Sequence, residues 1–500
     1  MTTMVAVDLG AQSGRVAVGR FDGERLEVDE THRFANVPVH DGDRLRWDIS
    51  DLYRNVLAGL SATHEHVGPV DSVAVDSWGV DFGLLDEANQ LLESPVHYRD
   101  ARRAKAFDRA LERVPARELY ERTGIQLLPI NSIFELAAMA AESDPALDAA
   151  RTLLLIPDLI HHWLAGPLVT ERTNASTTQF LDAGSGEWAT DLLVRLDVPV
   201  GFLPEIVEPG TAIGQLVPEV AAETGLGAVP VIAVGTHDTA SAVAAVPFGV
   251  EGSAFISIGT WSLVGVELAA PVIDDRTFDA NLTNEIGVAG TYRLLRNVTG
   301  LWLISECRNA WARAGVEYTF EELHELAATA LPLRSLIEPN DPVFTEPGDM
   351  PQRVRAFCSE TGQPEPEEPG AVIRCILESL ALKHWETMDV LGRATGVVPP
   401  EVHVVGGGAR NELLCRWTAD ATGLRVSCGP EEATVVGNLL VQAIALGEVS
   451  SIADAREVVR RSFSPTVFEP GDSAAWQEAR ERFTQFSAAA RAGSPEGARA

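Results

Sequence analysis

The chain has 500 residues, of which 46% are hydrophobic, and its 72 acidic and 39 basic residues give a formal net charge of −33 at pH 7. This length exceeds that of a usual single core, and the hydrophobic fraction is that of a globular protein, so we expect two folded domains rather than a disordered chain. The negative charge argues against nucleic acids and anionic membrane surfaces as partners, because both attract positive patches.

Lysine is nearly absent, since only Lys105 and Lys383 occur. Neither follows a glycine, which excludes a P-loop, and neither fits the lysine-bearing strand of protein kinases. Both lie in charged or helical stretches that predict peripheral positions, so we do not expect lysine-centred catalysis. The five cysteines form no C-x-x-C pair and the N-terminus lacks a basic leader, which favours a cytoplasmic location.

The first predicted element is a hairpin with two apolar strands around a turn rich in Gly and Ser, VAVDLGAQSGRVAV at 5–18. The backbone N–H groups of such a turn suit a phosphate. Asp8, before the turn, could hold Mg²⁺ directly or through water, and Arg15, after it, could offset phosphate charge. The alternatives are that Asp8 only forms the turn and that Arg15 is a solvent-exposed hairpin residue.

A partner strand at 25–30 and a helix at 47–60 follow, and then a buried strand, SVAVDSWG, ends at Gly79. Trp78 beside Gly79 could present an apolar face to a sugar ring while backbone groups reach its hydroxyls, although core packing also explains a tryptophan there. Residues 101–225 are predicted to be mostly helical.

A short buried strand at 229–235 leads into a helix whose polar start is His237-Asp238-Thr239. Near a helix N-terminus the positive end of the dipole should keep Asp238 ionised. An ionised aspartate is an adequate base for phosphoryl transfer to a hydroxyl. Alternatively, Asp238 only caps the helix and His237 is a structural histidine.

The pattern restarts beyond Gly249 with a second hairpin, AFISIGTWSLVGVE, which places Thr260 in another glycine-bearing turn. We therefore predict an N-terminal domain at 1–248 and a C-terminal domain at 249–475. A helix end and a frayed tail are predicted at 476–500.

The second half repeats the order of the first, with a strand at 292–298, helices at 300–315 and 371–396, and a strand, glycine turn and helix at 402–423. Within the strand at 292–298, Asn297 could hydrogen-bond a polyol or serve as a turn residue. The glycine run allows the backbone to approach a ligand closely at a helix N-terminus.

The segments DLGAQSGR, DSWGVDF, HDTASAV, SIGTWSL and VVGGGARNELL occur in the order and spacing of the FGGY family of carbohydrate kinases, which the chain resembles from about residue 5 to about residue 445. The resemblance implies an α/β fold of two actin-like (ribonuclease H-like) ATPase domains with an active-site cleft between them. It also implies ATP-dependent phosphorylation of the 1-hydroxyl of a ketose. The sequence leaves open which deoxyketose or pentulose is used, and a non-catalytic actin-like sugar sensor remains the alternative.

The resemblance also implies that the domain at 1–248 holds the sugar site and the base, and that the domain at 249–475 binds the nucleotide. Asp238 would be the catalytic base, and Mg²⁺ would lie near Asp8. The sugar would be bound by Gly79, His237, Asp238, Thr239 and Asn297. ATP would be bound by Ala11, Gln12, Ser13, Gly14, Arg15, Thr260, Ser305 and Gly407. Gln12 occupies a position where Ser is more usual in the family, and Ser305 one where Gln is more usual. These two differences put only the fine geometry of ATP binding in question. The expected assembly is a monomer or a homodimer that binds the sugar and ATP, but no nucleic acid and no membrane.

Overall fold

The computed structural model describes residues 1–471 and 474–493, which form two compact units. The first unit comprises Met1–Pro247, Glu267–Leu294 and Ala433–Phe463. The second comprises Phe248–Val266, Leu295–Glu432 and the described residues from Ser464 onward. The units are discontinuous in sequence, whereas the domain ranges 1–248 and 249–475 are continuous, and those ranges stay a prediction.

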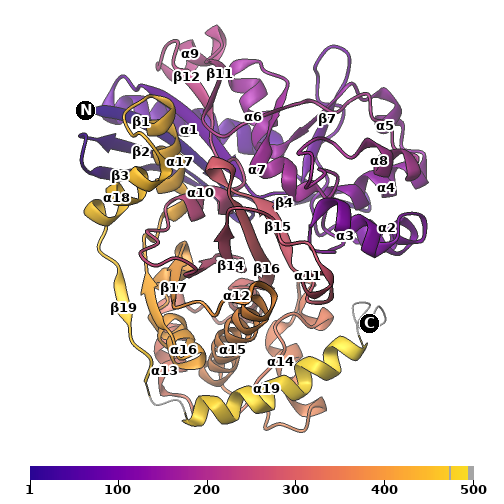
Figure 1. The fold of residues 1–500 in the computed structure, drawn as a ribbon, viewed down its shortest axis with the longest axis vertical. Helices are drawn as coiled ribbons and strands as arrows, with labels where there is room; N and C mark the ends of the chain where they lie inside the picture. Colours follow the sequence, from indigo (N-terminus) through magenta and orange to yellow (C-terminus); the bar gives the residue numbers. More distant parts are fainter. Residues whose placement is uncertain (472–473, 494–500) are drawn as a thin grey trace. The chain divides into compact units, whose positions relative to one another are not determined.

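A six-stranded sheet with the order β11-β12-β6-β1-β2-β3 organises the first unit (Figure 1). Strands β1 and β2 form the predicted antiparallel hairpin, while β6 and β12 run parallel to β1. Every residue of β6 is buried, as expected for a parallel strand covered on both faces. The strands of this sheet are β1 (Thr2–Leu9), β2 (Ser13–Phe21), β3 (Leu26–Ala35), β6 (Ser72–Ser77), β11 (Thr211–Gln215) and β12 (Pro230–Ala233).

Helices pack on this sheet because each has an apolar face. The predicted helix after β5 is present, and Asp48 caps it by accepting a hydrogen bond from the backbone of Asp51. The helices around the sheet are α1 (Ile49–Val67), α6 (Ile156–Ala165), α9 (Pro218–Thr224), α10 (Asp238–Ala244), α17 (Ala433–Ala445) and α18 (Ile452–Ser462).

Helix α17 comes from the C-terminal region of the chain but lies beside β1 and α10, as the golden and indigo ribbons in Figure 1 show. Its approach to α10 requires a glycine. A Cβ built on Gly437 would lie 1.7 Å from the backbone oxygen of Ser241. A side chain at position 437 would therefore force the two helices apart.

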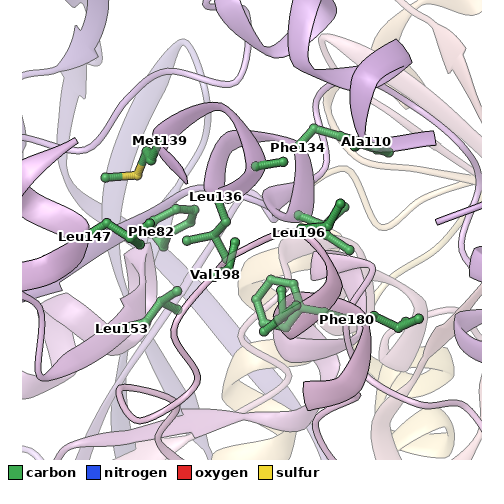
Figure 2. Packing of buried hydrophobic residues seen from close by; sticks show 14 of the residues in the cluster. Phe82, Ala110, Phe134, Leu136, Met139, Leu147, Leu153, Phe180, Leu196 and Val198 are labelled. Carbon is green, nitrogen blue, oxygen red and sulfur yellow. The ribbon is translucent and has the colours of Figure 1, made fainter. Parts of the chain in front are cut away.

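A largely helical region between β7 and β12 has its own hydrophobic core within the first unit. Figure 2 shows Phe82, Phe134, Leu136, Phe180 and Leu196 meeting there, and Phe134 is fully buried. This agrees with the helical prediction for 101–225. The helices of this region are α2 (Ala101–Arg113), α3 (Ala116–Thr123), α4 (Ser132–Glu142), α5 (Pro145–Ala149), α7 (Arg172–Ala175), η1 (Ser176–Thr178) and α8 (Thr190–Arg195).

Short strands and turns complete the first unit. Two-stranded pairings join β4 to β5, β7 to β8 and β9 to β10. The remaining elements of the first unit are β4 (Pro38–Asp41), β5 (Arg44–Trp47), β7 (Phe82–Leu85), β8 (Thr152–Leu155), β9 (Val169–Glu171), β10 (Glu205–Val207), α11 (Asp275–Asp279), β15 (Thr283–Ile286) and η2 (Val288–Gly290).

In the second unit, β14, β13, β17, β18 and β19 lie in this order in one sheet. The second predicted hairpin is present as β13 and β14, and β17 runs parallel to β13. Strand β16 begins in the first unit and ends in the second, whereas β14 begins in the second and ends in the first. These strands are β13 (Ala254–Ile258), β14 (Trp261–Leu268), β16 (Tyr292–Thr299), β17 (Glu401–Val405), β18 (Arg425–Cys428) and β19 (Thr466–Phe468).

The helices of the second unit include the predicted long helix at 371–396. The C-terminal helix is described to Gly493, and the tail predicted beyond it lies outside the described residues. These elements are α12 (Trp302–Arg313), α13 (Phe320–Thr329), η3 (Pro342–Phe344), α14 (Met350–Glu360), α15 (Pro369–Thr395), η4 (Gly407–Arg410), α16 (Glu412–Thr422) and α19 (Ala474–Gly493).

The predicted peripheral position of Lys383 is wrong. Its side chain is 2% exposed in the middle of α15, and Nζ lies 2.9 Å from Glu338 and 2.7 Å from Glu386. A helical pattern places a residue on a helix but does not reveal the two carboxylates that make the burial of an ammonium group tolerable. Among the described residues, no helix combines the length and apolar character needed to cross a bilayer.

Candidate active site

Three aspartates of the first unit lie at the carboxyl ends of the neighbouring parallel strands β12, β6 and β1. Asp8 and Asp76 are direct register partners on β1 and β6. Asp238 opens α10 after β12, and His237 before it forms a bridge with Ser77 at the end of β6. Ligands of open α/β sheets bind at such strand ends, so this edge is the candidate active site.

Arg15 neutralises one of these aspartates. It is the register partner of Asp8 across the first hairpin, and its Nε and NH2 atoms lie 2.8 Å and 2.5 Å from Oδ2 of Asp8. The predicted pair therefore exists, with the guanidinium already bound to the carboxylate. The charge of this guanidinium also acts on Asp76, the register partner of Asp8 on β6.

Asp76 is fully buried beneath this cluster. Its Oδ2 accepts a hydrogen bond of 2.6 Å from Asn438 of α17, while its Oδ1 has no hydrogen-bond partner among the described residues. Burial raises the pKa of Asp76 well above its ordinary value, and the nearby charge of Asp8 raises it further. Asp76 lies within the predicted strand that ends at Gly79, and no role was predicted for it.

The carboxyl group of Asp238 is 29% exposed and has one oxygen fixed. Thr239 donates a hydrogen bond of 3.0 Å to Oδ1, and Nε2 of His237 lies 3.5 Å from the same oxygen. Within the described chain, Oδ2 has no hydrogen-bond partner. The arrangement holds the carboxylate by one oxygen and offers the other to a ligand.

Burial, rather than the start of the helix, has the largest effect on the pKa of Asp238. Burial raises the pKa of Asp238, which the neighbouring His237 lowers in part and the charge of Asp8 raises again. The helix that begins at Asp238 has seven residues, and the loss of water around the carboxyl group outweighs any help from its N-terminus. A raised pKa makes the aspartate a stronger base when it is ionised.

The first glycine turn has the form expected of a phosphate-binding loop. The N–H of Gly10 donates to the carbonyl oxygen of Ser13. Asn36 donates from its side-chain Nδ2 to the carbonyl oxygen of Gly10 and from its backbone N–H to that of Gln12. In the part of the chain that the structure describes, the N–H groups of Ala11 and Gln12 have no acceptor. These two donors and the exposed Ser13 could receive phosphate oxygens, and Gln12 is itself exposed.

Magnesium fits this edge only as a hydrated ion. Among the described residues, no group of three His, Cys, Asp or Glu side chains is arranged to hold a metal ion directly. The mutual repulsion of Asp8, Asp76 and Asp238, and the Oδ1 of Asp76 that has no partner among the described residues, would nevertheless favour a cation at this edge. Mg²⁺ commonly keeps several waters and uses one or two carboxylates together with substrate phosphates, which matches this donor set.

Gly79 lies next to this edge, in a position that only glycine tolerates. A Cβ there would lie 2.9 Å from Oγ1 and 3.0 Å from Cγ2 of Thr177. The next N–H, of Val80, donates to Oγ1 of Thr177 at 3.1 Å. The first unit thus brings Gly79, His237 and Asp238 to one region, as predicted for the sugar.

The predicted ligands of the second unit gather at the carboxyl ends of β13 and β17. Thr260 lies in the turn after β13, and its carbonyl oxygen accepts hydrogen bonds from Gly300 and Trp302. The glycine turn after β17 packs against the end of β13, where a Cβ on Gly408 would lie 2.2 Å from Ile258.

The remaining residues predicted in this unit lie beside that edge. Gly407 begins the glycine turn's 3₁₀-helix, and Asn297 lies on β16, the strand that leads into the first turn of α12. Ser305 is in that first turn, and its N–H donates to Leu301, whose own N–H donates to Gly259. The second unit therefore brings Thr260, Gly407 and Ser305 to adjoining turns.

Residues that surround the candidate base were not predicted from the sequence. Glu171, fully buried, accepts hydrogen bonds from the N–H of Thr236 at 2.9 Å and from its hydroxyl at 2.8 Å. Arg293 and Glu285 contact the ring nitrogen Nδ1 of His237, at 3.2 Å and 3.3 Å. Nothing in the local sequence around Glu171, Glu285 or Arg293 indicates contact with residues 236–238.

Comparison with known proteins assigns the family. Residues 3–245 match the N-terminal domain and residues 254–446 the C-terminal domain of the FGGY family of carbohydrate kinases. A rhamnulokinase from Bacteroides thetaiotaomicron is 43% identical over 475 residues, which cover 95% of this chain and 97% of that protein. A rhamnulokinase from Enterococcus faecalis is 39% identical over 93% of this chain and 94% of that protein.

Solved structures have the same fold at low identity. A xylulose kinase from Lactobacillus acidophilus matches with a TM-score of 0.81 at 16% identity, over all of both chains. A glycerol kinase from Plasmodium falciparum, determined with ADP, matches with a TM-score of 0.76 at 15% identity, over 98% of this chain and 97% of that one. The predicted α/β fold with two actin-like domains is confirmed by these likenesses, and the two family matches together span most of the sequence. The chain belongs to the FGGY family of carbohydrate kinases and is a sugar kinase.

Proposed function

We propose that this kinase transfers the γ-phosphoryl group of ATP to L-rhamnulose, giving L-rhamnulose 1-phosphate and ADP in the breakdown of rhamnose. Rhamnulokinases that are 37–43% identical over more than nine-tenths of the chain support this substrate. The observation that carries the mechanism is the carboxyl group of Asp238, with Oδ1 fixed by Thr239 and Oδ2 open to a ligand.

Asp238 is the general base of the proposed reaction. The oxygen of the sugar's 1-hydroxyl attacks the γ-phosphorus, the bond from that phosphorus to the β,γ-bridging oxygen breaks, and Oδ2 of Asp238 takes the hydroxyl proton. Because the transition state of phosphoryl transfer is loose, the proton leaves late and a carboxylate is a sufficient acceptor. The raised pKa of Asp238 assists this transfer.

Sugar binding is assigned to Gly79, His237 and Thr239 of the first unit and to Asn297 of the second. The backbone at Gly79 can approach a sugar hydroxyl because no side chain intervenes, while His237, Thr239 and Asn297 offer polar groups. A pocket that hydrogen-bonds each hydroxyl discriminates strongly against a sugar that leaves one of these groups unpaired.

Nucleotide binding is assigned to both glycine turns. The partnerless N–H groups of Ala11 and Gln12 support phosphate binding at the first turn, together with Ser13, Gly14 and Arg15. In the second unit the proposed contacts are Thr260, Ser305 and Gly407.

Magnesium is the proposed metal, held near Asp8 mainly through water and phosphate oxygens. When bound, it neutralises charge on the phosphates. Asp8 keeps Arg15 oriented toward the first turn, where the guanidinium can contact a phosphate.

The cellular location of the enzyme is proposed from its cysteines. All five cysteines are buried and free of disulfides, which supports a reducing, cytoplasmic location. We propose a monomer or a homodimer that binds its sugar and ATP and engages neither nucleic acid nor membrane.

The test is ADP release with Mg²⁺ and ATP against a panel of L-rhamnulose, L-fuculose, L-xylulose, D-xylulose and glycerol. The proposal expects the highest kcat/KM with L-rhamnulose. A higher value with L-fuculose or a pentulose would keep the chemistry and change the substrate. Turnover of none of the sugars would overturn the proposal and favour a non-catalytic sugar sensor.

A further inference from the structure

Arg293 is a fully buried arginine that touches His237 in the first unit. Its NH2 group donates hydrogen bonds of 3.2 Å to Nδ1 of His237 and 3.0 Å to the carbonyl oxygen of Ile286. Its NH1 group lies 3.3 Å from Oε2 of Glu285, a side chain that is 6% exposed. A buried guanidinium requires such a carboxylate, so Arg293 and Glu285 form one charged unit beside the histidine.

Both members of this pair compete for the same ring nitrogen. Oε2 of Glu285 lies 3.3 Å from Nδ1 of His237, nearly as close as Arg293. A guanidinium can only donate a hydrogen bond and an ionised carboxylate can only accept one, so Nδ1 cannot satisfy both. Only the contact with Arg293 has hydrogen-bond geometry, and it requires Nδ1 to carry no proton.

We propose that Arg293 is a positioning residue that keeps the proton of His237 on Nε2, the nitrogen that faces Oδ1 of Asp238 at 3.5 Å. Nε2–H then places a partial positive charge near Oδ1, the oxygen to which Thr239 donates its hydrogen bond. Oδ2 is left to accept the sugar proton. This inference rests on the proposed role of Asp238 as the base.

The opposite tautomer would work against catalysis. With the proton on Nδ1, the lone pair of Nε2 would face the Asp238 carboxylate, and the two acceptors would repel each other. The carboxylate would then turn away or lose its fixed oxygen. Arg293 therefore acts on the base through His237 and is not itself a catalytic residue.

The backbone at His237 is fixed independently of Arg293. Glu171 binds Thr236 through two hydrogen bonds, and the N–H of His237 donates to Oγ1 of Thr173 at 3.3 Å. Removing the guanidinium would therefore change where the ring proton resides more than where the ring lies. The effect of Arg293 on the position of the ring proton can therefore be measured apart from its effect on the position of the ring.

The test is the tautomer of His237, read from long-range ¹H–¹⁵N spectra of the full chain labelled at histidine, without substrates. The signal is assigned by its loss in His237→Asn. We expect the wild-type ring to carry its proton on Nε2, and Arg293→Met to move it to Nδ1, where Glu285 can accept it. The wild-type spectrum alone overturns the proposal if the proton is on Nδ1, so the test survives even if Arg293→Met fails to fold.

Kinetics provide the second readout. Arg293→Met should lower kcat about tenfold or more with little change in the KM for ATP, and Arg293→Lys, which retains a donor, should recover part of the loss. Arg276→Met, the same change at a side chain that is 60% exposed in the same unit, should leave kcat unchanged. A loss of kcat in Arg293→Met with the proton still on Nε2 would show a merely structural role. If no sugar is turned over, the proposed function fails, whereas the tautomer result stands by itself.

Discussion

Nδ2 of Asn438 lies 2.6 Å from Oδ2 of Asp76, although 362 positions separate the two residues in the sequence. Gln442, one turn further along α17, holds Oδ1 of Asn438 at 2.7 Å and the carbonyl oxygen of Val5 at 3.0 Å. The C-terminal part of the chain thus supplies the partners of a buried carboxyl group at the active-site edge of the N-terminal sheet.

Replacing Asn438 by leucine should destabilise the protein strongly. Oδ2 of Asp76 and Nε2 of Gln442 would lose buried partners, and each such loss costs about 1–3 kcal/mol. Denaturant unfolding should show the loss, whereas Gln477→Leu, which replaces an amide at an exposed position of α19, should change stability by less than about 0.5 kcal/mol. Equal stability of the two variants would contradict the importance of the Asp76–Asn438 contact.

An alanine at Gly79 should weaken sugar binding. The new Cβ would lie about 3 Å from three atoms of Thr177, a buried β-branched side chain, so the end of β6 must move. Steady-state kinetics should show a KM for L-rhamnulose raised roughly tenfold or more, with the KM for ATP little changed. Gly201→Ala meets no neighbouring atom within 4 Å and is the matched control. An unchanged sugar KM in Gly79→Ala would remove Gly79 from the sugar site.

Removing the charge of Asp238 should abolish most turnover without abolishing binding. Asparagine keeps the shape of the side chain but cannot take a proton, and a general base is worth about a hundredfold or more in rate. Rapid-quench measurement of ADP formation by Asp238→Asn should show this loss, while calorimetry still detects the sugar. The exposed Asp197 provides an Asp→Asn control with normal activity. Turnover close to wild type would rule out Asp238 as the base.

The dependence of kcat/KM on pH should reflect the raised pKa of Asp238. Burial raises this pKa above the ordinary value of 3.8, His237 opposes the rise, and Asp8 adds to it. Only the ionised carboxylate accepts a proton, so kcat/KM for L-rhamnulose should fall as the pH drops through the raised pKa. A profile measured from about pH 4 to about pH 9 should therefore bend above the usual range for aspartate. An acid limb at or below pH 3.8 would contradict the burial of this group.

Asp158 predicts a change in stability with pH. Burial raises its pKa well above 3.8, the hydrogen bond from Thr170 lowers it in part, and the charge of Glu171 raises it again. The folded chain therefore holds the proton more tightly than the unfolded chain. The contribution of Asp158 to the free energy of unfolding increases as the pH falls from neutral toward 3.8.

Asparagine cannot ionise, so Asp158→Asn removes the free-energy cost of burying a charged carboxylate while retaining the contacts of Asp158. Its Oδ1 can accept from the N–H of Glu171, and its Nδ2 can donate to the hydroxyl of Thr170. Asp158→Asn should be more stable than wild type at about pH 8, with an advantage that shrinks as the pH falls. Thermal unfolding over this range checks it, and an advantage independent of pH would contradict a protonation effect.

The sequence was sufficient to predict features whose signal is local. A short stretch with an apolar-to-polar transition marks each of these features: both hairpins, the strand before His237 and the glycine turn near Gly407. Such a transition predicts the end of a strand, and the site residues lie at these ends. The interpretation of Asp238 as a candidate base needed only its place at the start of a helix.

Long-range partners were not predictable from one sequence. Nothing near Asp76 indicates Asn438, nothing near His237 indicates Arg293 and Glu285, and nothing near Lys383 indicates Glu338. Each pair is brought together by the packing of distant elements, and burial changes the electrostatics of its members. This is why the raised pKa of Asp238 and the buried position of Lys383 were both missed.

The most direct test of the proposed reaction is the NMR spectrum of the product formed from L-rhamnulose, ATP and Mg²⁺. The mechanism predicts one phosphate ester whose phosphorus couples to the two protons on carbon 1 of the sugar, formed in step with ADP. Coupling to a proton on another carbon would contradict attack by the 1-hydroxyl. Release of inorganic phosphate without any sugar ester would contradict the kinase reaction itself.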